Sequence, residues 1–242
     1  DCSLIDTCGF VRSFANLHKS FWTDKPMVHI TVMDDSLDEP APTKDHWGWP
    51  KMASHWNLPQ LEGKQVKVCT FTNCSDVELF INGKSMGTNE LKDFPDKMMT
   101  WTVPYEPGRI EAQGIQQGSK ACSDHLQTAG IPAKIHLLAD RYKIHADGCD
   151  LCHIEVQVTD ADGVLVPTAE HEIQFMIEGA GKIIGVDNGD LTSMEPYKAQ
   201  KRKVFHGRAM AIIQSLRQAG PITLSAQADG LLETKITIIA DE

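Results

Sequence analysis

Val77-Glu-Leu-Phe-Ile-Asn-Gly-Lys-Ser-Met86 contains the strongest local structural signal in the chain. Apolar side chains alternate with others along its first half, at Val77, Leu79 and Ile81, which is the period of a strand with one buried face. The dipeptide that follows, Asn82-Gly83, accepts the positive φ angles of a two-residue hairpin turn. The stretch therefore predicts a tight antiparallel hairpin, and it places the region around it in the all-β class.

Comparable short runs, separated by turn residues, extend on both sides of this hairpin. Those before residue 128 cover 28–33, 65–69, 99–103 and 109–113, and those after it cover 134–138, 154–158, 173–177, 183–184, 209–213, 222–226 and 235–239. About seven short strands for each hundred residues is typical of an immunoglobulin-like fold. We therefore expect two β-sandwich domains, at 27–128 and 129–242, with Thr128-Ala-Gly-Ile-Pro132 as the linker.

The first 26 residues have a different pattern. Phe10, Phe14, Leu17 and Phe21 recur at helical spacing, behind the apolar pair Leu4-Ile5 and a turn. The pattern predicts a short strand, a turn and a helix, as at the end of a domain whose body is missing. We expect the apolar stripe to dock on the first sandwich or on another copy of the chain.

Composition and charge exclude several classes of function. The chain has 242 residues, which allows two domains with their own cores, and 41% of them are hydrophobic. Its net charge of -10 disfavours nucleic acid as a partner, because the one basic run, residues 198–203, is short and fits a solvated loop or strand edge. No apolar run has the roughly 20 residues needed to span a bilayer, and residues 1–26 lack the order of a signal peptide.

No metal or cofactor is expected from the motifs. The seven cysteines are odd in number, and the pair Cys149-Asp-Leu-Cys152 has no second pair with which to form a zinc site. Gly185-Val-Asp-Asn-Gly-Asp190 offers closely spaced oxygens but lacks the length and the final glutamate of an EF-hand loop. We interpret it as turn chemistry, with an ion site as the alternative.

No catalytic residue is predicted either. Asn89-Glu90 superficially resembles the Asn-Glu pair of many glycosidases, but it follows the hairpin in a polar loop instead of ending a barrel strand. The candidate binding site is an aromatic cluster in a long polar stretch, made of Trp47, Trp49, His55, Trp56 and Asn57. Aromatic faces can stack on sugar rings while Asn and His bind hydroxyls, or the tryptophans can close the open end of a sandwich core. Both interpretations remain open at this stage.

Several motifs in a fixed order resemble the C-terminal half of β-galactosidase-like enzymes of glycoside hydrolase family 2. The motifs that carry the resemblance are residues 4–10, 18–22, 25–29, 55–57, 77–85, 103–108, 128–133, 146–148, 185–190 and 193–196, and the resemblance extends over nearly the whole chain. The resemblance implies that residues 1–26 are the last strand and helix of a TIM barrel and that two accessory sandwiches follow it. It also implies that the catalytic glutamates lie upstream, so no catalytic position can be transferred to this sequence.

The resemblance therefore implies non-catalytic accessory domains of a bacterial family 2 glycoside hydrolase that degrades carbohydrate, inactive alone. The implied partners are its own upstream barrel and a glycan, and a homo-oligomer is left open. The implied location is periplasmic or secreted, with the export signal absent from this chain. The alternatives are a stand-alone carbohydrate-binding module and a structural or oligomerisation element.

Overall fold

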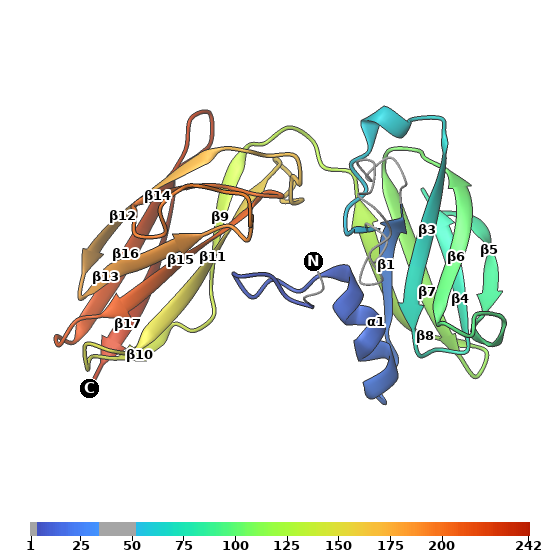
Figure 1. Cartoon of the computed structure of the whole chain (residues 1–242), viewed down its shortest axis with the longest axis horizontal. Helices are drawn as coiled ribbons and strands as arrows, with labels where there is room; N and C mark the ends of the chain where they lie inside the picture. The colour runs from blue at the N-terminus through green and yellow to red at the C-terminus, as the bar shows by residue number, and fades with distance from the viewer. Residues whose placement is uncertain (1–3, 34–51) are drawn as a thin grey trace. The chain divides into compact units, whose positions relative to one another are not determined.

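The computed structural model describes residues 4–33 and 52–242. The chain divides into two units (Figure 1). Unit 1 comprises Asp1–Asp6 and Val11–Thr128, and unit 2 comprises Thr7–Phe10 and Ala129–Glu242. Both are built almost entirely of strands, so the all-β class predicted from the sequence is confirmed.

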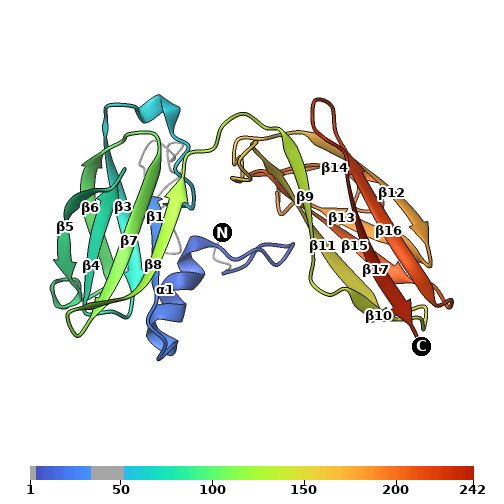
Figure 2. The ribbon, with the colours of Figure 1, turned by 180° about the vertical axis from the view of Figure 1, so that it is seen from behind.

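Unit 1 is a sandwich of two four-stranded sheets, which Figures 1 and 2 show from opposite sides. Its elements are α1 (Ser13–Trp22), β1 (Val28–Met33), β2 (Met52–Ala53), β3 (Gln65–Thr72), β4 (Asp76–Ile81), β5 (Lys84–Glu90), β6 (Met98–Pro104), β7 (Arg109–Gln116) and β8 (Ser119–Gln127). One sheet has the order β2-β1-β3-β6 and the other has the order β5-β4-β7-β8. The ladders between these strands are antiparallel.

The predicted hairpin is present as β4 and β5. Ile81 pairs with Lys84 across the turn, and Asn82 and Gly83 have φ angles of 49° and 81°. Two positive φ values are what a type I′ turn requires, and its twist matches that of the flanking strands. The apolar residues of β4 (Val77, Leu79 and Ile81) are buried, so the period-two pattern correctly predicted the face that meets the core.

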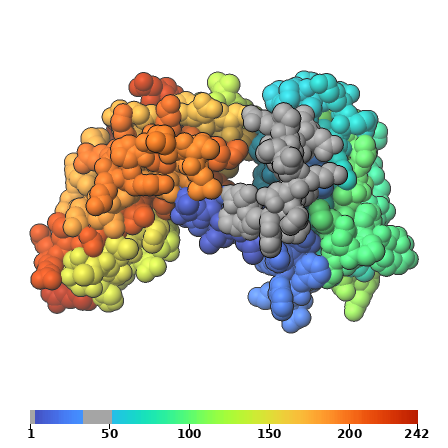
Figure 3. Space-filling model, viewed as in Figure 1, coloured from blue at the N-terminus to red at the C-terminus, as the bar shows by residue number. Residues whose placement is uncertain are grey.

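Helix α1 packs on the β2-β1-β3-β6 sheet of unit 1 and is exposed on its outer side (Figure 3). Phe14 and Leu17 are buried, and the Phe14 ring meets Phe71 of β3 edge-on at 6.0 Å between centroids. Phe21 remains 52% exposed. Phe10 lies before the helix begins, so the spacing that grouped it with the helical stripe was misleading there.

Unit 2 is a second sandwich. Its strands are β9 (Lys134–Ala139), β10 (Lys143–His145), β11 (Leu151–Thr159), β12 (Glu172–Gly179), β13 (Gly181–Asp187), β14 (Lys201–Lys203), β15 (Arg208–Ser215), β16 (Gly220–Gln227) and β17 (Thr234–Asp241). One sheet has the order β10-β17-β16-β12-β14 and the other has the order β13-β15-β11-β9. The strands β10 and β17 pair in parallel. Between the sheets lies a core of aliphatic side chains and Phe175.

Candidate functional site

The described part of the predicted aromatic cluster centres on Trp56, whereas Trp47 and Trp49 lie outside the described residues. The side chain of Trp56 is 0% exposed and belongs to the core of unit 1. Its ring lies 4.8 Å from that of Tyr105, and its Nε1 donates a hydrogen bond to the Glu106 carbonyl oxygen at 2.8 Å. A fully enclosed indole offers no face to a sugar, so this geometry favours the core-closing interpretation for Trp56.

The backbone around Trp56 is held by side chains from distant parts of unit 1. Its carbonyl oxygen accepts hydrogen bonds from the Tyr105 hydroxyl at 3.1 Å and from Thr128 Oγ1 at 2.6 Å. The Tyr105 hydroxyl in turn accepts the Leu58 backbone amide at 3.1 Å. These bonds join the segment after β2 to the ends of β6 and β8, so residues 56–58 form a fixed closure at one end of the sandwich.

His55 and Asn57 flank Trp56 and are partly exposed. The backbone amide of Asn57 donates to His55 Nδ1 at 3.2 Å. Because Nδ1 accepts this bond, the neutral imidazole carries its proton on Nε2, which is the donor arrangement that a hydroxyl or carbonyl partner needs. The predicted site residues are therefore divided, with Trp56 inside the core and His55 and Asn57 at the surface on either side of it.

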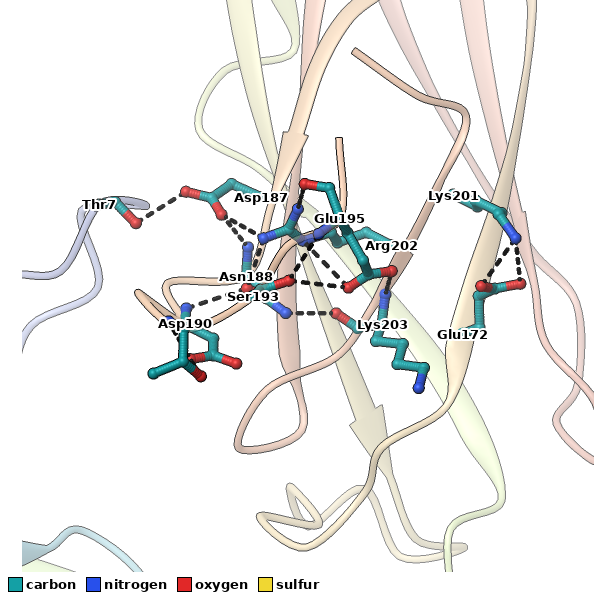
Figure 4. A network of polar contacts seen from close by, with 11 residues as sticks. Thr7, Glu172, Asp187, Asn188, Asp190, Ser193, Glu195, Lys201, Arg202 and Lys203 are labelled. Atoms are coloured by element: carbon teal, nitrogen blue, oxygen red, sulfur yellow. Dashed lines mark hydrogen bonds and ion pairs between the residues drawn. The ribbon is translucent and has the colours of Figure 1, made fainter. Parts of the chain in front are cut away.

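A second polar cluster lies in unit 2 at the ends of β13 and β14 (Figure 4). Arg202 is 1% exposed, and its Nη2 donates to Asp187 Oδ1 and to Asn188 Oδ1, both at 3.0 Å. Its Nη1 donates to the Glu195 carbonyl oxygen at 3.0 Å, and its guanidinium lies 5.4 Å from the centre of the Tyr197 ring. Burial of a charged guanidinium requires this degree of pairing.

The same cluster explains the loop at residues 185–190. Asn188 Oδ1 also accepts the Asp190 amide, and the amide and hydroxyl of Thr192 both donate to Asp190 Oδ1. These two bonds from Thr192 hold the pKa of Asp190 below its usual range. Thr7 Oγ1 donates to the other oxygen of Asp187, Oδ2, at 2.8 Å. The oxygens of this loop are occupied by protein donors, so the geometry favours turn chemistry, with Arg202 as the cation that the loop surrounds.

Arg202 is the residue of this cluster that the sequence prediction missed. The basic run at 198–203 was interpreted as a solvated loop or strand edge, and its three lysines fit that description, since all are exposed and Lys201 pairs with Glu172 at the surface. In β14 the burial alternates, with Lys201 and Lys203 exposed and Arg202 buried. The alternation of side chains along a strand could have predicted this burial, because the middle residue of a three-residue strand points to the opposite face from its two neighbours.

Residues of the remaining sequence motifs contact other groups of the protein. Asn89 Nδ2 donates to the Thr100 carbonyl oxygen, and Glu90 pairs with the exposed Lys92. Cys152 is buried and its thiol contacts the Arg141 carbonyl oxygen, and burial raises its pKa to about 12, whereas Cys149 is exposed. Within residues 4–33 and 52–242, no group of three or more His, Cys, Asp or Glu side chains is placed to hold a metal ion.

Unit 2 also contains an open cleft of about 710 Å³. Its lining comes from the β10 region and the end of β17, and comprises Arg141, Lys143, Ile144, His145, Asp147, Cys149, Asp150 and Asp241. Backbone amides hold the pKa values of Asp147 and Asp150 below their usual range, so these carboxylates already serve the loop. No Phe, Tyr or Trp side chain is among these lining residues, so the cleft lacks the large flat apolar face on which sugar rings stack.

Two family models match the chain, one in each unit. Residues 135–237 match glycoside hydrolase family 2 C-terminal domain 5, and residues 63–122 match a domain of unknown function, DUF4982. Among the described residues, no helix has the length and the apolar character needed to cross a membrane.

Curated and solved relatives agree with the family models. The β-galactosidase BoGH2A of Bacteroides ovatus is 34% identical over 99% of this chain and 25% of its own length. A putative β-glucuronidase of Formosa agariphila is 28% identical over 98% of this chain and 21% of its own length. A glycosyl hydrolase family 2 member from Bacteroides cellulosilyticus has a similar structure, with a TM-score of 0.91 and 33% identity over 100% of this chain and 32% of that chain. The chain thus spans a quarter or less of the length of these two curated relatives.

Proposed function

Because this chain corresponds to the C-terminal region of glycoside hydrolase family 2 enzymes, we propose that it forms non-catalytic accessory domains of such an enzyme, acting in carbohydrate degradation. One observation carries the proposal: 99% of the chain aligns with only 25% of a β-galactosidase. A segment of that extent leaves most of the relative's length for the domain that performs the hydrolysis. The relatives include a β-galactosidase and a putative β-glucuronidase, which supports a β-linked glycoside as the substrate of the parent enzyme.

Several carboxylates of the chain already form ion pairs and hydrogen bonds with protein groups, which supports this assignment. Hydrolysis by two carboxyl groups requires them about 5–5.5 Å apart for retention, or roughly 6.5–9.5 Å apart for inversion, with access to the sugar. In unit 2, Asp187 and Glu195 are instead tied to the buried Arg202. In unit 1, Glu111 accepts from Gln113 and Lys120. Carboxylates that pair with protein cations and donors stabilise the fold, as expected of non-catalytic accessory domains.

The N-terminal segment supports the barrel as partner. We assign residues 1–26 to the last strand and helix of a catalytic TIM barrel, and 27–128 and 129–242 to the sandwiches that follow. Several apolar side chains of this segment are exposed, namely Ile5 (52%), Val11 (62%), Phe21 (52%) and Trp22 (86%). Apolar surface of this kind is stabilised by a partner, and neighbouring barrel helices are the partner that the family context supplies. A parent of this kind from a bacterium would act in the periplasm or outside the cell.

Two measurements test the proposal. The purified chain is expected to hydrolyse neither p-nitrophenyl β-D-galactoside nor p-nitrophenyl β-D-glucuronide, because the catalytic pair belongs to the barrel. Turnover that persists after repurification, and that disappears when a carboxylate of this chain is replaced, would overturn it. The gene sequence upstream of Asp1 is expected to encode a barrel with two catalytic glutamates, and a different kind of domain there contradicts the assignment.

A stand-alone carbohydrate-binding module is the alternative, and the position of His55 and Asn57 favours it. Both are partly exposed on either side of Trp56, where polar groups suit the binding of sugar hydroxyls. The burial of Trp56 weakens it, because one of the three predicted stacking rings is already used by the core. Calorimetric titration of the chain with galactosides distinguishes the two.

A further inference from the structure

Two cysteine thiols of unit 1 lie against each other although they are 48 residues apart in the chain. Cys74 occupies the turn between β3 and β4, and Cys122 lies in β8. Their Sγ atoms are 3.6 Å apart, and both cysteines are free. A disulfide bond is about 2.05 Å long, so the two sulfurs have to approach each other by about 1.5 Å to form one.

Gly114 provides an independent sign that the two sulfurs share one site. It lies in β7 opposite Cys122, next to a register shift between β7 and β8. A Cβ atom built on Gly114 would lie 2.6 Å from the Cys122 sulfur and 2.8 Å from the Cys74 sulfur. Both thiols therefore occupy the space that a side chain at position 114 would need, and the absence of that side chain is what lets them meet.

The site is well fixed on the Cys74 side. The Cys74 amide donates to Thr72 Oγ1 at 3.0 Å, and Thr72 Oγ1 donates to the Met27 carbonyl oxygen at 2.5 Å. The neighbouring Asn73 accepts the Met27 amide and donates to the carbonyl oxygens of Thr23 and Lys25. The turn that carries Cys74 thus also holds the connection from α1 into β1.

We propose that Cys74 and Cys122 are a built redox pair that forms an intramolecular disulfide when the protein meets a small-molecule disulfide oxidant. Cys122 is the partly exposed thiol and reacts first: its thiolate attacks one sulfur of the oxidant, and one thiolate of the oxidant leaves. The Cys74 thiolate then attacks the Cys122 sulfur of the mixed disulfide and displaces the second oxidant thiolate. The two protons lost by the cysteines go to the two leaving thiolates, so the protein loses two electrons and the oxidant gains them.

The bond would couple three parts of unit 1. It would join the β3–β4 turn, which connects the two sheets, to β8 at the edge of the β5-β4-β7-β8 sheet, beside the segment that enters β1. A cross-link over a span of this length removes conformational freedom from the unfolded chain and so stabilises the folded unit. Both cysteines lie in unit 1, so the cross-link depends neither on a hydrolase parent nor on where that parent acts.

The environment of Cys122 determines how fast the disulfide forms. Burial, together with the adjacent Cys74, raises the pKa of the Cys122 thiol to about 12. The thiolate is the nucleophile, so a raised pKa makes the fraction that reacts small at neutral pH. Oxidation is therefore expected to be slow at pH 7 and to accelerate about tenfold for each unit of pH between 7 and 9.

Peptide mapping tests the pair directly. The fully reduced chain is incubated at low concentration with oxidised glutathione, alkylated, and digested with trypsin without reduction. A linked species of residues 68–84 and 121–134 is expected, with fragmentation placing the bond on Cys74 and not on Cys69, which lies in the same peptide. The oxidised chain is expected to melt about 5–15 °C higher than the reduced chain.

Variants provide the controls. Cys122→Ser is expected to abolish both the linked peptide and the melting shift, while Cys149→Ser, which removes an exposed thiol of unit 2, is expected to retain both. Gly114→Ala is expected to slow the cross-link at least tenfold by placing a methyl group against both sulfurs. If the wild-type chain retains all its thiols after prolonged oxidation at pH 9, or if its cross-links join other cysteines, the pair is not a redox site.

Discussion

The Arg202 guanidinium donates to the Asp187 carboxylate at 3.0 Å, between two strands that belong to opposite sheets of unit 2. Arg202 is enclosed, whereas Asp187 keeps one oxygen toward Thr7. The pair therefore joins the two sheets through a charge that cannot reach water. Removal of one partner would leave the other charge uncompensated, and that asymmetry makes the pair testable.

Arg202→Met is expected to destabilise unit 2 by about 3–5 kcal/mol, because it removes the cation paired with Asp187 and the donor to the Glu195 carbonyl oxygen. Urea unfolding followed by near-UV circular dichroism measures the change. Lys201→Met is the matched control, since Lys201 lies in the same strand but pairs with Glu172 at the surface, and it should cost less than about 1 kcal/mol. Equal effects of the two variants would show that the buried pair contributes no more than a surface pair.

Trp56→Ala is expected to destabilise unit 1 by about 3–5 kcal/mol, because it empties a fully buried aromatic site. Trp56→Phe should recover most of the packing and lose the hydrogen bond to the Glu106 carbonyl oxygen, at a cost of about 1–2 kcal/mol. Thermal unfolding measures both. Trp22→Ala serves as the control, since Trp22 is 86% exposed and should change stability by less than about 0.5 kcal/mol. A Trp56→Ala variant as stable as the wild type would contradict the core-closing assignment.

Asp160 is expected to give unit 2 a pH-dependent contribution to stability. Burial alone would raise its pKa, but backbone amides of Gly130, Val164 and Asp162 donate to the carboxylate, and the net pKa is lowered. A lowered pKa stabilises the fold above the ordinary carboxyl pKa of about 3.9, and this stability is lost as the pH falls through the lower folded-state value.

Asp160→Asn is therefore expected to cost about 1–3 kcal/mol at pH 7 and progressively less below about pH 4. Urea unfolding at a series of pH values between 2.5 and 7 measures it. The exposed Asp162→Asn provides the comparison and should show a small effect throughout. A cost that stays constant with pH would indicate that the carboxyl charge at position 160 plays no part.

Sugar binding by the chain alone is expected to be negligible, because we propose that barrel residues complete the predicted tryptophan site. Titration calorimetry with galactosides and a plant polysaccharide tests this expectation. Sub-millimolar binding that is lost in Trp47→Ala would reverse it and favour the binding module, with each stacked ring contributing about 1 kcal/mol. Trp56→Ala is less suitable for this purpose, since it also disturbs the core.

The strands that the sequence predicted are those with a buried apolar face. Residues 222–226 and 235–239 were recognised, and they lie inside β16 and β17, which have alternating burial over part of their length. Strand β8 was missed because it is an edge strand whose residues, Ser119–Gln127, are exposed or half-buried. Its partner β7 supplies the pairing, and no pattern of apolar residues marks it.

The candidate site was predicted less well than the fold, because a residue type does not state its burial. A tryptophan in a polar stretch suits both a sugar platform and the closure of a core, and only the contact of Trp56 with Tyr105 and Glu106 distinguishes them. In the same way, the basic run at 198–203 does not reveal that Arg202 is buried, because its counter-ion Asp187 lies in a strand of the other sheet.

The sequence by itself determined the all-β class, the hairpin at Asn82-Gly83 and the faces of the apolar strands. These depend on local properties: the allowed φ angles of two residues and a side-chain period of two. Only the tertiary structure decided that Arg202 meets Asp187, that Trp56 is enclosed, and that Cys74 lies against Cys122. Each of these depends on strand register and sheet packing, which bring together residues that are distant in the chain and whose proximity no local pattern encodes.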